Sequence, residues 1–491
     1  MICKEEWPFE IEGKALSIGV FHAGSEYVKN VCIQETDVDI NWPKQTATFT
    51  SKMPKLDKDE DDSDQNDGGE ESGDTVIKRS IDTKREDQKL IKEKESKNIA
   101  LVIDATKGIE SIPGRIFLGT AVKGNRRVYW EFGHSELNNR HILIFGSSGM
   151  GKTYTIQCLL CELGKVGQNS LIIDYTNGFS ENHLEPGLIK LLNPSQHIVR
   201  KEPLPINPFR RLEEVYGKER VLENIVNTAQ RVAGVFSEVY TLGEQQKASL
   251  YAAIKNGLEK EVKSEMSLDS LVDKLRELED SDAPEGRYAG TILSKITPFV
   301  DMNPFGPEKE GSWDRLFKDM DNRCHILQLV GFMRDSWKLI VEFALIDLYA
   351  YYRIMGSQNK PRVVVLDEVQ NLDQREDSPL AQLLREGRKF GFSLILATQI
   401  MSNLQKDERD RLFNAGHKLF FRPADTEMRS YADIAAVSTG EDVSEWMRRL
   451  AQLQKGECYS LGPSKNDVTS KLETKAFRIK IASLEERGFN G

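Results

Sequence analysis

Compact apolar runs, separated by stretches with helical periodicity, recur along the chain from residue 98 to its end. Each run is nearly continuous in Val, Ile and Leu, a pattern that favours strands of a parallel sheet whose two faces are both covered. The pattern therefore predicts an α/β domain that spans residues 99–491. The expected strands are 99–104, 141–145, 170–174, 325–330, 363–366, 393–397 and 418–421.

Between about 205 and 320 the pattern changes to almost entirely helical. Ser267 precedes leucines at 268, 271, 275 and 278, which share one face of a helix that Ser267 would cap. Thr241 and Glu244 have the spacing of a capping box, which predicts another helix that runs to Leu258. We therefore expect a helical insertion at about 205–320 within the sheet domain.

The first 98 residues have a different character. Short extended runs at 15–21, 31–33 and 46–50 predict a small β-rich segment over residues 1–53. Residues 54–98 are first acidic and then mixed in charge, with few apolar positions to bury, and they predict a disordered linker.

The net charge of −10 is concentrated in one part of this linker. Residues 57–74 hold ten acidic residues and one lysine, and the remainder of the chain is almost neutral. The overall acidity therefore does not exclude DNA as a partner, because it does not describe the rest of the surface.

Cysteine usage and the N-terminus bear on the compartment. Six cysteines are scattered along the chain, and the one close pair, Cys158 and Cys161, has no second pair and no histidines at zinc-ligand spacing. This usage is typical of a reduced intracellular protein without a structural metal. Because the sequence also shows no signal-peptide pattern and no apolar stretch long enough to span a membrane, it predicts a cytoplasmic protein without membrane contact.

The strongest chemical signal is Gly146-Ser-Ser-Gly-Met-Gly-Lys-Thr153, which fits the phosphate-loop pattern GxxxxGK[ST] between an expected strand and an expected helix. Glycines let such a loop fold around phosphate oxygens, and the N–H groups at the start of the helix supply partial positive charge. Lys152 adds a full charge, and the hydroxyl of Thr153 suits magnesium. The expected nucleotide-binding residues are Gly146, Ser147, Ser148, Gly149, Met150, Gly151, Lys152, Thr153 and Tyr154.

An apolar strand that ends in Asp367 and Glu368 supplies the two carboxylates that nucleotide hydrolysis needs. Asp367 would hold Mg²⁺ together with Thr153, and Glu368 would orient and deprotonate the attacking water. Gln399 follows another expected strand, where it would either sense the γ-phosphate or cap a loop. Asp174 ends a third strand, and two roles stay open for it: a contact to water on the magnesium ion, or the stabilisation of a turn.

Together these motifs resemble the HerA/FtsK superfamily of ring-forming DNA-translocating ATPases over residues 110–485. The resemblance implies a RecA-like P-loop NTPase core, ATP and Mg²⁺ as cofactors, ATP hydrolysis, double-stranded DNA as a partner and a homo-oligomer in the form of a hexameric ring. It also implies catalytic roles for Lys152, Glu368 and Gln399, and for Arg140 or Arg388 as an arginine that reaches a neighbour's γ-phosphate. The residues that carry the resemblance lie at 139–153, 172–174, 206–209, 367–368, 387–391, 397–399 and 456–462.

Within the superfamily, further runs are most similar to the C-terminal motor of the DptH family, the HerA-type ATPases of phosphorothioation-dependent DNA restriction. This likeness implies a restriction or phage-defence system with a partner nuclease or other restriction subunits. One departure from the superfamily follows the second strand: where it often has Asp-x-x-Gly-Glu, this chain has Asp174-Tyr-Thr-Asn-Gly-Phe179, so the resemblance implies no role for a second acid there. The runs that carry the likeness are 130–134, 174–179, 203–209 and 240–246.

Two functions remain open at this point. In one, the chain is a motor that moves DNA through a ring, with 369–375 as a candidate pore loop and DNA held mainly by charge. In the other, ATP binding holds an oligomeric scaffold together and activates a partner nuclease without processive movement. Because both use the same site, DNA-stimulated turnover would distinguish them.

Overall fold

The structure is a computed structural model that describes residues 114–489, apart from 218, 261–265, 307–312, 314–322, 467–468 and 470, together with four strands among the first 51 residues. The chain divides into two compact units, residues 1–91 and 92–491. The strand expected at 99–104, the run at 31–33 and the linker at 54–98 lie outside the described residues.

The described part of the first unit consists of two antiparallel hairpins. Strand β1 (Glu5–Ile11) pairs with β2 (Lys14–Val20), and β3 (Thr36–Asn41) pairs with β4 (Thr46–Ser51). The extended runs expected at 15–21 and 46–50 coincide with β2 and β4.

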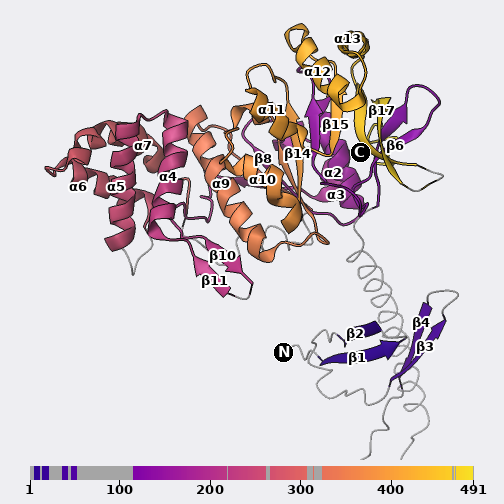
Figure 1. The fold of residues 1–491 in the computed structure, drawn as a ribbon, viewed down its shortest axis with the longest axis horizontal. Coiled ribbons are helices and arrows are strands. Elements are labelled where there is room, and N and C mark those ends of the chain that lie inside the picture. The colour runs from indigo at the N-terminus through magenta and orange to yellow at the C-terminus, as the bar shows by residue number, and fades with distance from the viewer. Residues whose placement is uncertain are drawn as a thin grey trace, which may run out of the picture. The chain divides into compact units, whose positions relative to one another are not determined.

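The second unit is built on one large sheet whose centre is parallel, as the apolar pattern predicts (Figure 1). Among the described residues, eleven strands form this sheet in the order β6-β5-β17-β16-β15-β7-β14-β13-β8-β12-β9. The strands from β15 to β9 run parallel to one another, and β16, β17, β5 and β6 form an antiparallel flank. The fold is therefore α/β with a mainly parallel sheet.

In the parallel part the bounds of the strands agree closely with the expected runs, except that β9 has no counterpart among them. This part contains β7 (Ile142–Phe145), β8 (Ser170–Asp174), β9 (Ser195–Ile198), β12 (Cys324–Gln328), β13 (Arg362–Leu366), β14 (Phe392–Thr398) and β15 (His417–Phe421). The flank contains β5 (Ile116–Ala121), β6 (Arg127–Trp130), β16 (Glu457–Lys465) and β17 (Leu472–Ile481), so the first and last described strands of this unit lie in it.

Helices cover both faces of the sheet, and successive strand residues contribute to two separate apolar cores. Along β7, Leu143 and Phe145 belong to one core, whereas Ile142 and Ile144 belong to the other. The second core is closed by α2 (Lys152–Lys165) and α3 (Pro186–Leu192). The first is closed by α9 (Arg334–Met355), α10 (Pro379–Glu386), α11 (Lys406–Phe413), α12 (Met428–Thr439) and α13 (Val443–Ala451).

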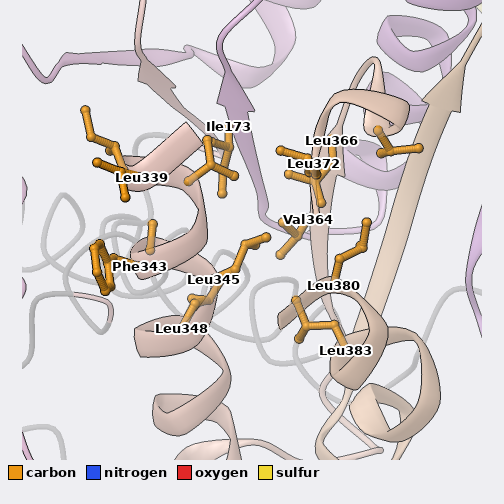
Figure 2. Packing of buried hydrophobic residues seen from close by; sticks show 14 of the residues in the cluster. Ile173, Leu339, Phe343, Leu345, Leu348, Val364, Leu366, Leu372, Leu380 and Leu383 are labelled. Carbon is orange, nitrogen blue, oxygen red and sulfur yellow. The ribbon is translucent and has the colours of Figure 1, made fainter. Parts of the chain in front are cut away.

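The first core is densest where α9 and α10 meet the strands. Figure 2 shows Leu339 and Phe343 of α9 on one side of this core and Leu380 of α10 on the other, with Ile173 and Val364 of the sheet between them. All of these side chains are buried. Removal of this much apolar surface from water is what holds the helices on the sheet.

The insertion forms a helical lobe beside α9 (Figure 1). It contains α4 (Ile225–Tyr240), α5 (Glu244–Lys260), α6 (Leu268–Glu279) and α7 (Ala289–Asp301). Ser267 caps α6 as expected, because its hydroxyl accepts a hydrogen bond from the backbone N–H of Ser270. The four leucines of α6 are buried.

Two features of the insertion differ from the expectation. A hairpin of β10 (Glu213–Tyr216) and β11 (Glu219–Leu222) precedes the helices. The capping box at Thr241 is wrong: Thr241 ends α4 in a left-handed conformation, with φ 51°, and its N–H bonds back to the carbonyl of Glu238. At the start of α5 (Glu244–Lys260), Gln246 of the first turn reaches back instead, and its side-chain oxygen accepts from the N–H of Gly243, the residue before the helix.

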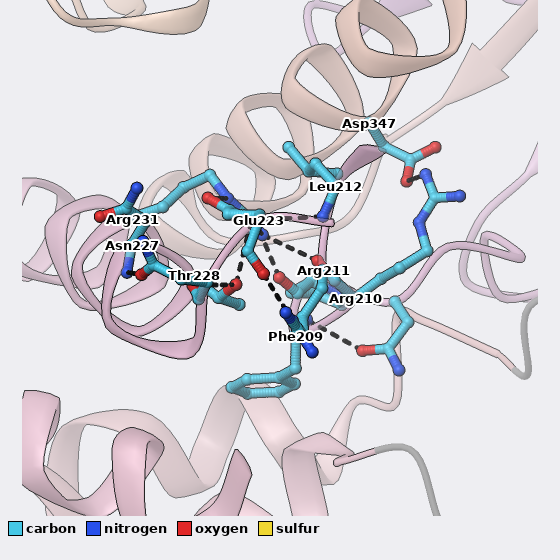
Figure 3. A network of polar contacts seen from close by, with 12 residues as sticks. Phe209, Arg210, Arg211, Leu212, Glu223, Asn227, Thr228, Arg231 and Asp347 are labelled. Atoms are coloured by element: carbon cyan, nitrogen blue, oxygen red, sulfur yellow. Dashed lines mark hydrogen bonds and ion pairs between the residues drawn. The ribbon is translucent and has the colours of Figure 1, made fainter. Parts of the chain in front are cut away.

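A polar network joins the start of the insertion to α9 (Figure 3). The guanidinium of Arg210 lies 2.6 Å from a carboxylate oxygen of Asp347 on α9, and Trp313 donates to the other oxygen at 2.6 Å. Glu223 accepts from both Arg231 and the hydroxyl of Thr228. These contacts fix the lobe at its attachment point.

Within the part of the chain that the structure describes, no helix combines the length and apolar character that crossing a bilayer requires.

Candidate nucleotide site

The glycine-rich loop lies between β7 and α2, at the carboxyl ends of the parallel strands. Gly149 and Gly151 adopt left-handed backbone, with φ 77° and 108°, which residues with a Cβ rarely adopt. Lys152 begins α2 and turns back over the loop, where its Nζ donates to the carbonyl oxygens of Gly146 at 2.9 Å and Ser147 at 3.3 Å. The loop is thus closed on its own lysine, at the position where phosphate oxygens would take these donors.

Burial lowers the pKa of Lys152, and the carboxylates of Glu368 and Asp367 oppose that shift. The charges of Asp367 and Glu368 therefore act on Lys152, while its Nζ contacts the carbonyl oxygens of the loop. An ammonium group in such a buried position gains most from a negatively charged ligand, since little water competes for it.

The C-terminal elements hold the other side of the loop. The backbone N–H and hydroxyl of Ser147 both donate to the carbonyl of Arg422 at 3.0 Å, and the carbonyl of Met150 accepts from the N–H of Gly456. Tyr154 extends away from the loop, where its hydroxyl accepts from the N–H of Leu484 at 3.0 Å. Of the expected nucleotide-binding residues, Tyr154 therefore has its phenol engaged in a structural contact.

Thr153 and Asp367 come together although 214 residues separate them, and the threonine hydroxyl lies 3.4 Å from Oδ2 of Asp367. Burial and the neighbouring Glu368 raise the pKa of Asp367 to about 6, against the opposing effect of Lys152. A hydroxyl and a carboxylate at the end of a phosphate loop are hard oxygen ligands, the kind that Mg²⁺ takes alongside phosphate oxygens. The residues present fit that ion.

Glu368 follows β13 in a left-handed conformation, with φ 52°. One of its carboxylate oxygens accepts from the side-chain amide of Gln399, and the other accepts from the amide of Gln370. The structure therefore places the amide of Gln399 on the carboxylate of the candidate catalytic base. Capping of a loop alone would not require this contact.

Asp174 organises the turn that follows β8. Its Oδ1 accepts from the N–H groups of Thr176 and Gly178, and its Oδ2 accepts from the N–H of Phe179 and the amide of Gln328. With both oxygens engaged in this way, the geometry favours the turn over a contact to magnesium-bound water. The turn also brings Gly178 beside the site, because a Cβ there would lie 3.9 Å from Oδ2 of Asp367.

Arg140 and Arg388 lie together at the opposite edge of the sheet. Arg140 precedes β7, and Arg388 lies in the short helix η5 (Gly387–Phe390) that precedes β14. Burial and the charge of Arg388 lower the pKa of Arg140, whose Nε donates to the carbonyl of Phe132 at 2.7 Å. The length of β7, roughly 13 Å of extended chain, separates both arginines from the phosphate loop of their own chain.

Sequence reasoning missed Tyr175 and Gln370 as residues of this site. The Tyr175 hydroxyl donates to the carbonyl of Asp367, and its ring stacks on Trp337 with 4.3 Å between ring centroids. Tyr175 directly follows β8 and Gln370 lies in the short turn after β13, and a place after a parallel strand was the one signal available for them.

A cavity of about 360 Å³ adjoins Thr153 on the side of α3. Asn177, Gly178 and His183 line it together with residues of α2. The amide of Gln157 fixes its outer wall, because it donates to the carbonyl of His183.

A parallel sheet with a phosphate loop at its carboxyl edge, and an Asp-Glu pair after a nearby strand, defines a P-loop NTPase of the RecA-like fold. Residues 116–346 match the family model described as the central domain of the helicase HerA. The chain thus carries a domain related to the HerA central domain.

Individual proteins give the same picture. The chain is 22% identical over 347 residues to the DNA double-strand break repair helicase HerA of Sulfolobus acidocaldarius, a match that covers 66% of this chain and 62% of that protein. It is 23% identical over 361 residues to the DNA import protein CedB of the same organism, covering 71% and 54%. The chain thus spans about six-tenths or less of the length of these relatives.

Among solved structures, VirB4 of Thermoanaerobacter pseudethanolicus superposes with a TM-score of 0.59 and 15% sequence identity. The superposition covers 78% of this chain and all of that chain. At this identity the likeness establishes the fold.

Proposed function

We propose that the chain is an ATP-hydrolysing motor that moves or unwinds DNA. The observation that carries the proposal is the grouping of Lys152, Thr153, Asp367 and Glu368 at one edge of the sheet, with the amide of Gln399 on the carboxylate of Glu368. Two relatives are named as a helicase and as a DNA import protein, which supports DNA as the substrate.

Each residue of the site has a distinct task in this proposal. Lys152 and the N–H groups of the loop bind the β- and γ-phosphates of ATP. Thr153 and Asp367 would hold Mg²⁺, which supplies charge neutralisation on the phosphate oxygens when bound. Glu368 orients a water molecule and accepts its proton, and Gln399 reports the presence of the γ-phosphate.

The arginines complete the proposal in an oligomer. Arg140 and Arg388 lie too far from the phosphate loop of their own chain to serve it, and their position at the other edge of the sheet suits contact with a neighbour. In a hexameric ring, either arginine would stabilise the charge that spreads over the transferring phosphoryl group of the adjacent subunit. Double-stranded DNA would pass through the ring.

The finer proposal places the motor in a DptH-like restriction or phage-defence system with a partner nuclease. It is supported by the sequence runs that resemble the DptH motor.

The test is the rate of ATP hydrolysis with and without double-stranded DNA, with oligomeric mass recorded in the same samples. Glu368→Gln removes the base and is compared with Glu376→Gln, which makes the same change at a carboxylate whose side chain is 83% exposed. A motor requires DNA to raise turnover, Glu368→Gln to abolish it and Glu376→Gln to retain it. If ATP assembles the ring while DNA leaves turnover unchanged, the protein is a nucleotide-gated scaffold.

A further inference from the structure

Both carboxylate oxygens of Glu368 are held by side-chain amides. Nε2 of Gln399 donates to Oε1, and Nε2 of Gln370 donates to Oε2. Gln399 reaches the carboxylate from the end of β14, whereas Gln370 reaches it from η4 (Val369–Asn371), the short helix directly after Glu368. The two contacts therefore come from different elements and reach different oxygens of the carboxylate.

The orientation of the Gln370 amide is itself fixed. Its Oε1 accepts a hydrogen bond from the hydroxyl of Thr398 at 2.7 Å, and Thr398 is fully buried in β14. Because an ionised carboxylate only accepts hydrogen bonds, the NH₂ side of the amide must face Glu368, which leaves the carbonyl side for the Thr398 hydroxyl; that hydroxyl also lies 3.2 Å from the carbonyl oxygen of Ile400. Thr398, Gln370 and Glu368 thus form a directed chain of hydrogen bonds.

The register of the sheet explains why this chain exists. Strands β13 and β14 are parallel, and Leu366 pairs with Leu396. Two residues further along, Glu368 has left β13, whereas Thr398 is the last residue of β14 and still pairs with Phe145 of β7. Gln370 bridges them within one turn of η4.

Glu368 needs such support because its backbone is left-handed, a conformation that is costly for a residue with a Cβ. If the amide of Gln399 responds to the γ-phosphate, its contact with Glu368 changes during the reaction, unlike the contact from Gln370. Gln370 has no such second task, since its other amide atom is already bound to Thr398.

We propose that Gln370 is the positioning residue that aims the Glu368 carboxylate at the attacking water, and that the Thr398 hydroxyl acts through it. This inference rests on the proposed ATP hydrolysis. The competing role is a purely structural link between η4 and β14, in which the hydrogen bonds stabilise the fold and leave the reaction unaffected.

The experiment measures kcat and KM for ATP, nucleotide affinity and the thermal midpoint of unfolding. Gln370→Met keeps the length of the side chain and removes the amide. Thr398→Val removes the hydroxyl, Thr398→Ser retains it, and the two changes Gln370→Met and Thr398→Val are also combined. Gln382→Met, in α10, is the matched control because the amide of its half-buried side chain donates to a backbone carbonyl, that of Asp377.

A positioning role predicts that Gln370→Met lowers kcat by roughly tenfold, a part of the 10²–10⁴ that a general base contributes. KM and nucleotide affinity should stay within about twofold, since the change removes no contact to the nucleotide. Thr398→Val should lower kcat in the same direction, Thr398→Ser should restore it, and the double variant should be no slower than Gln370→Met alone, because both act on one chain of contacts.

Three results would overturn the inference. One is kcat within twofold of wild type in Gln370→Met, a second is additive losses in the double variant, and the third is a loss that Gln382→Met shares. If wild type hydrolyses ATP and Glu368→Gln is inactive, these results refute only the role of Gln370. If wild type binds nucleotide without hydrolysing it, the proposed function fails as well.

Discussion

Glu342 provides a quantitative test of the packing around the candidate site. This carboxyl group lies on α9, is 3% exposed, and accepts a hydrogen bond at 3.1 Å from the backbone N–H of Asp373. Its second oxygen has no hydrogen-bond partner among the described residues. Burial raises the pKa of Glu342 to about 8, with a smaller raising effect from the charge of Asp373, while the N–H of Asp373, Lys338 and Arg375 lower it.

The direction of the pH effect follows from proton binding. In the unfolded chain the carboxyl loses its proton near its ordinary pKa of 4.5, whereas in the folded chain it keeps the proton up to about pH 8. Between these values the folded state binds the extra proton, so the stability that this group contributes is complete below 4.5 and is lost as the pH rises to 8. At 1.36 kcal/mol for each pKa unit, the loss between pH 5 and pH 8 is about 4 kcal/mol.

Glu342→Gln removes this dependence, since an amide does not titrate. Denaturant unfolding of both proteins at pH 5, 6, 7 and 8 should show the free energy of unfolding of wild type falling relative to the variant by about 4 kcal/mol over this range. Any cost of the amide itself is the same at every pH. The exposed substitution Glu376→Gln should show no such trend, and parallel pH curves for wild type and Glu342→Gln would refute the reasoning.

Three further predictions concern the phosphate loop, the turn after β8 and the insertion. Lys152→Ala should weaken ATP binding by roughly ten- to hundredfold, because it removes a hydrogen bond from a charged group. A titration with fluorescent nucleotide measures the affinity, and an unchanged affinity would contradict the role of the loop. Asp174→Asn should lower the free energy of unfolding by about 2–4 kcal/mol, because the NH₂ group of the asparagine would face backbone N–H groups that bond to the carboxylate in wild type. Equal stability of the two proteins would show that the turn does not depend on the carboxylate. Ser267→Ala should cost about 1 kcal/mol through loss of the α6 cap, measured by the unfolding midpoint, and Ser294→Ala, a change within α7, serves as its comparison.

The parallel core could be predicted from sequence because its signal is local. A strand that is buried on both faces must be apolar at every position, and β7, β8 and β14 satisfy that requirement without reference to their neighbours. The antiparallel flank carries no such signal. Strands β5 and β17 pair across more than 350 residues, and their burial depends on a partner that the sequence does not identify.

Local signals also mislead where two elements compete for one residue. Thr241 has the residue type and spacing of a helix start, and in the structure it ends the preceding helix. The carbonyls of Ser237 and Glu238 at the end of α4 take its N–H group and keep it in that helix. A capping pattern shows only that a residue is able to cap a helix start. Whether it does so depends on whether the end of the preceding helix also binds that residue.

The candidate site divides in the same way. Lys152 and Thr153 belong to one continuous motif, and Asp367 and Glu368 to another, so each half could be read from neighbouring residues. The contacts between Glu368 and the two glutamines depend instead on which strand lies beside β13 and in what register. Since β14 is that strand and Leu366 pairs with Leu396, the sheet places Thr398, Gln399 and Gln370 around one carboxylate. The candidate catalytic residues are thus visible in the sequence, and the residues proposed to position them become visible only once the strand order is known.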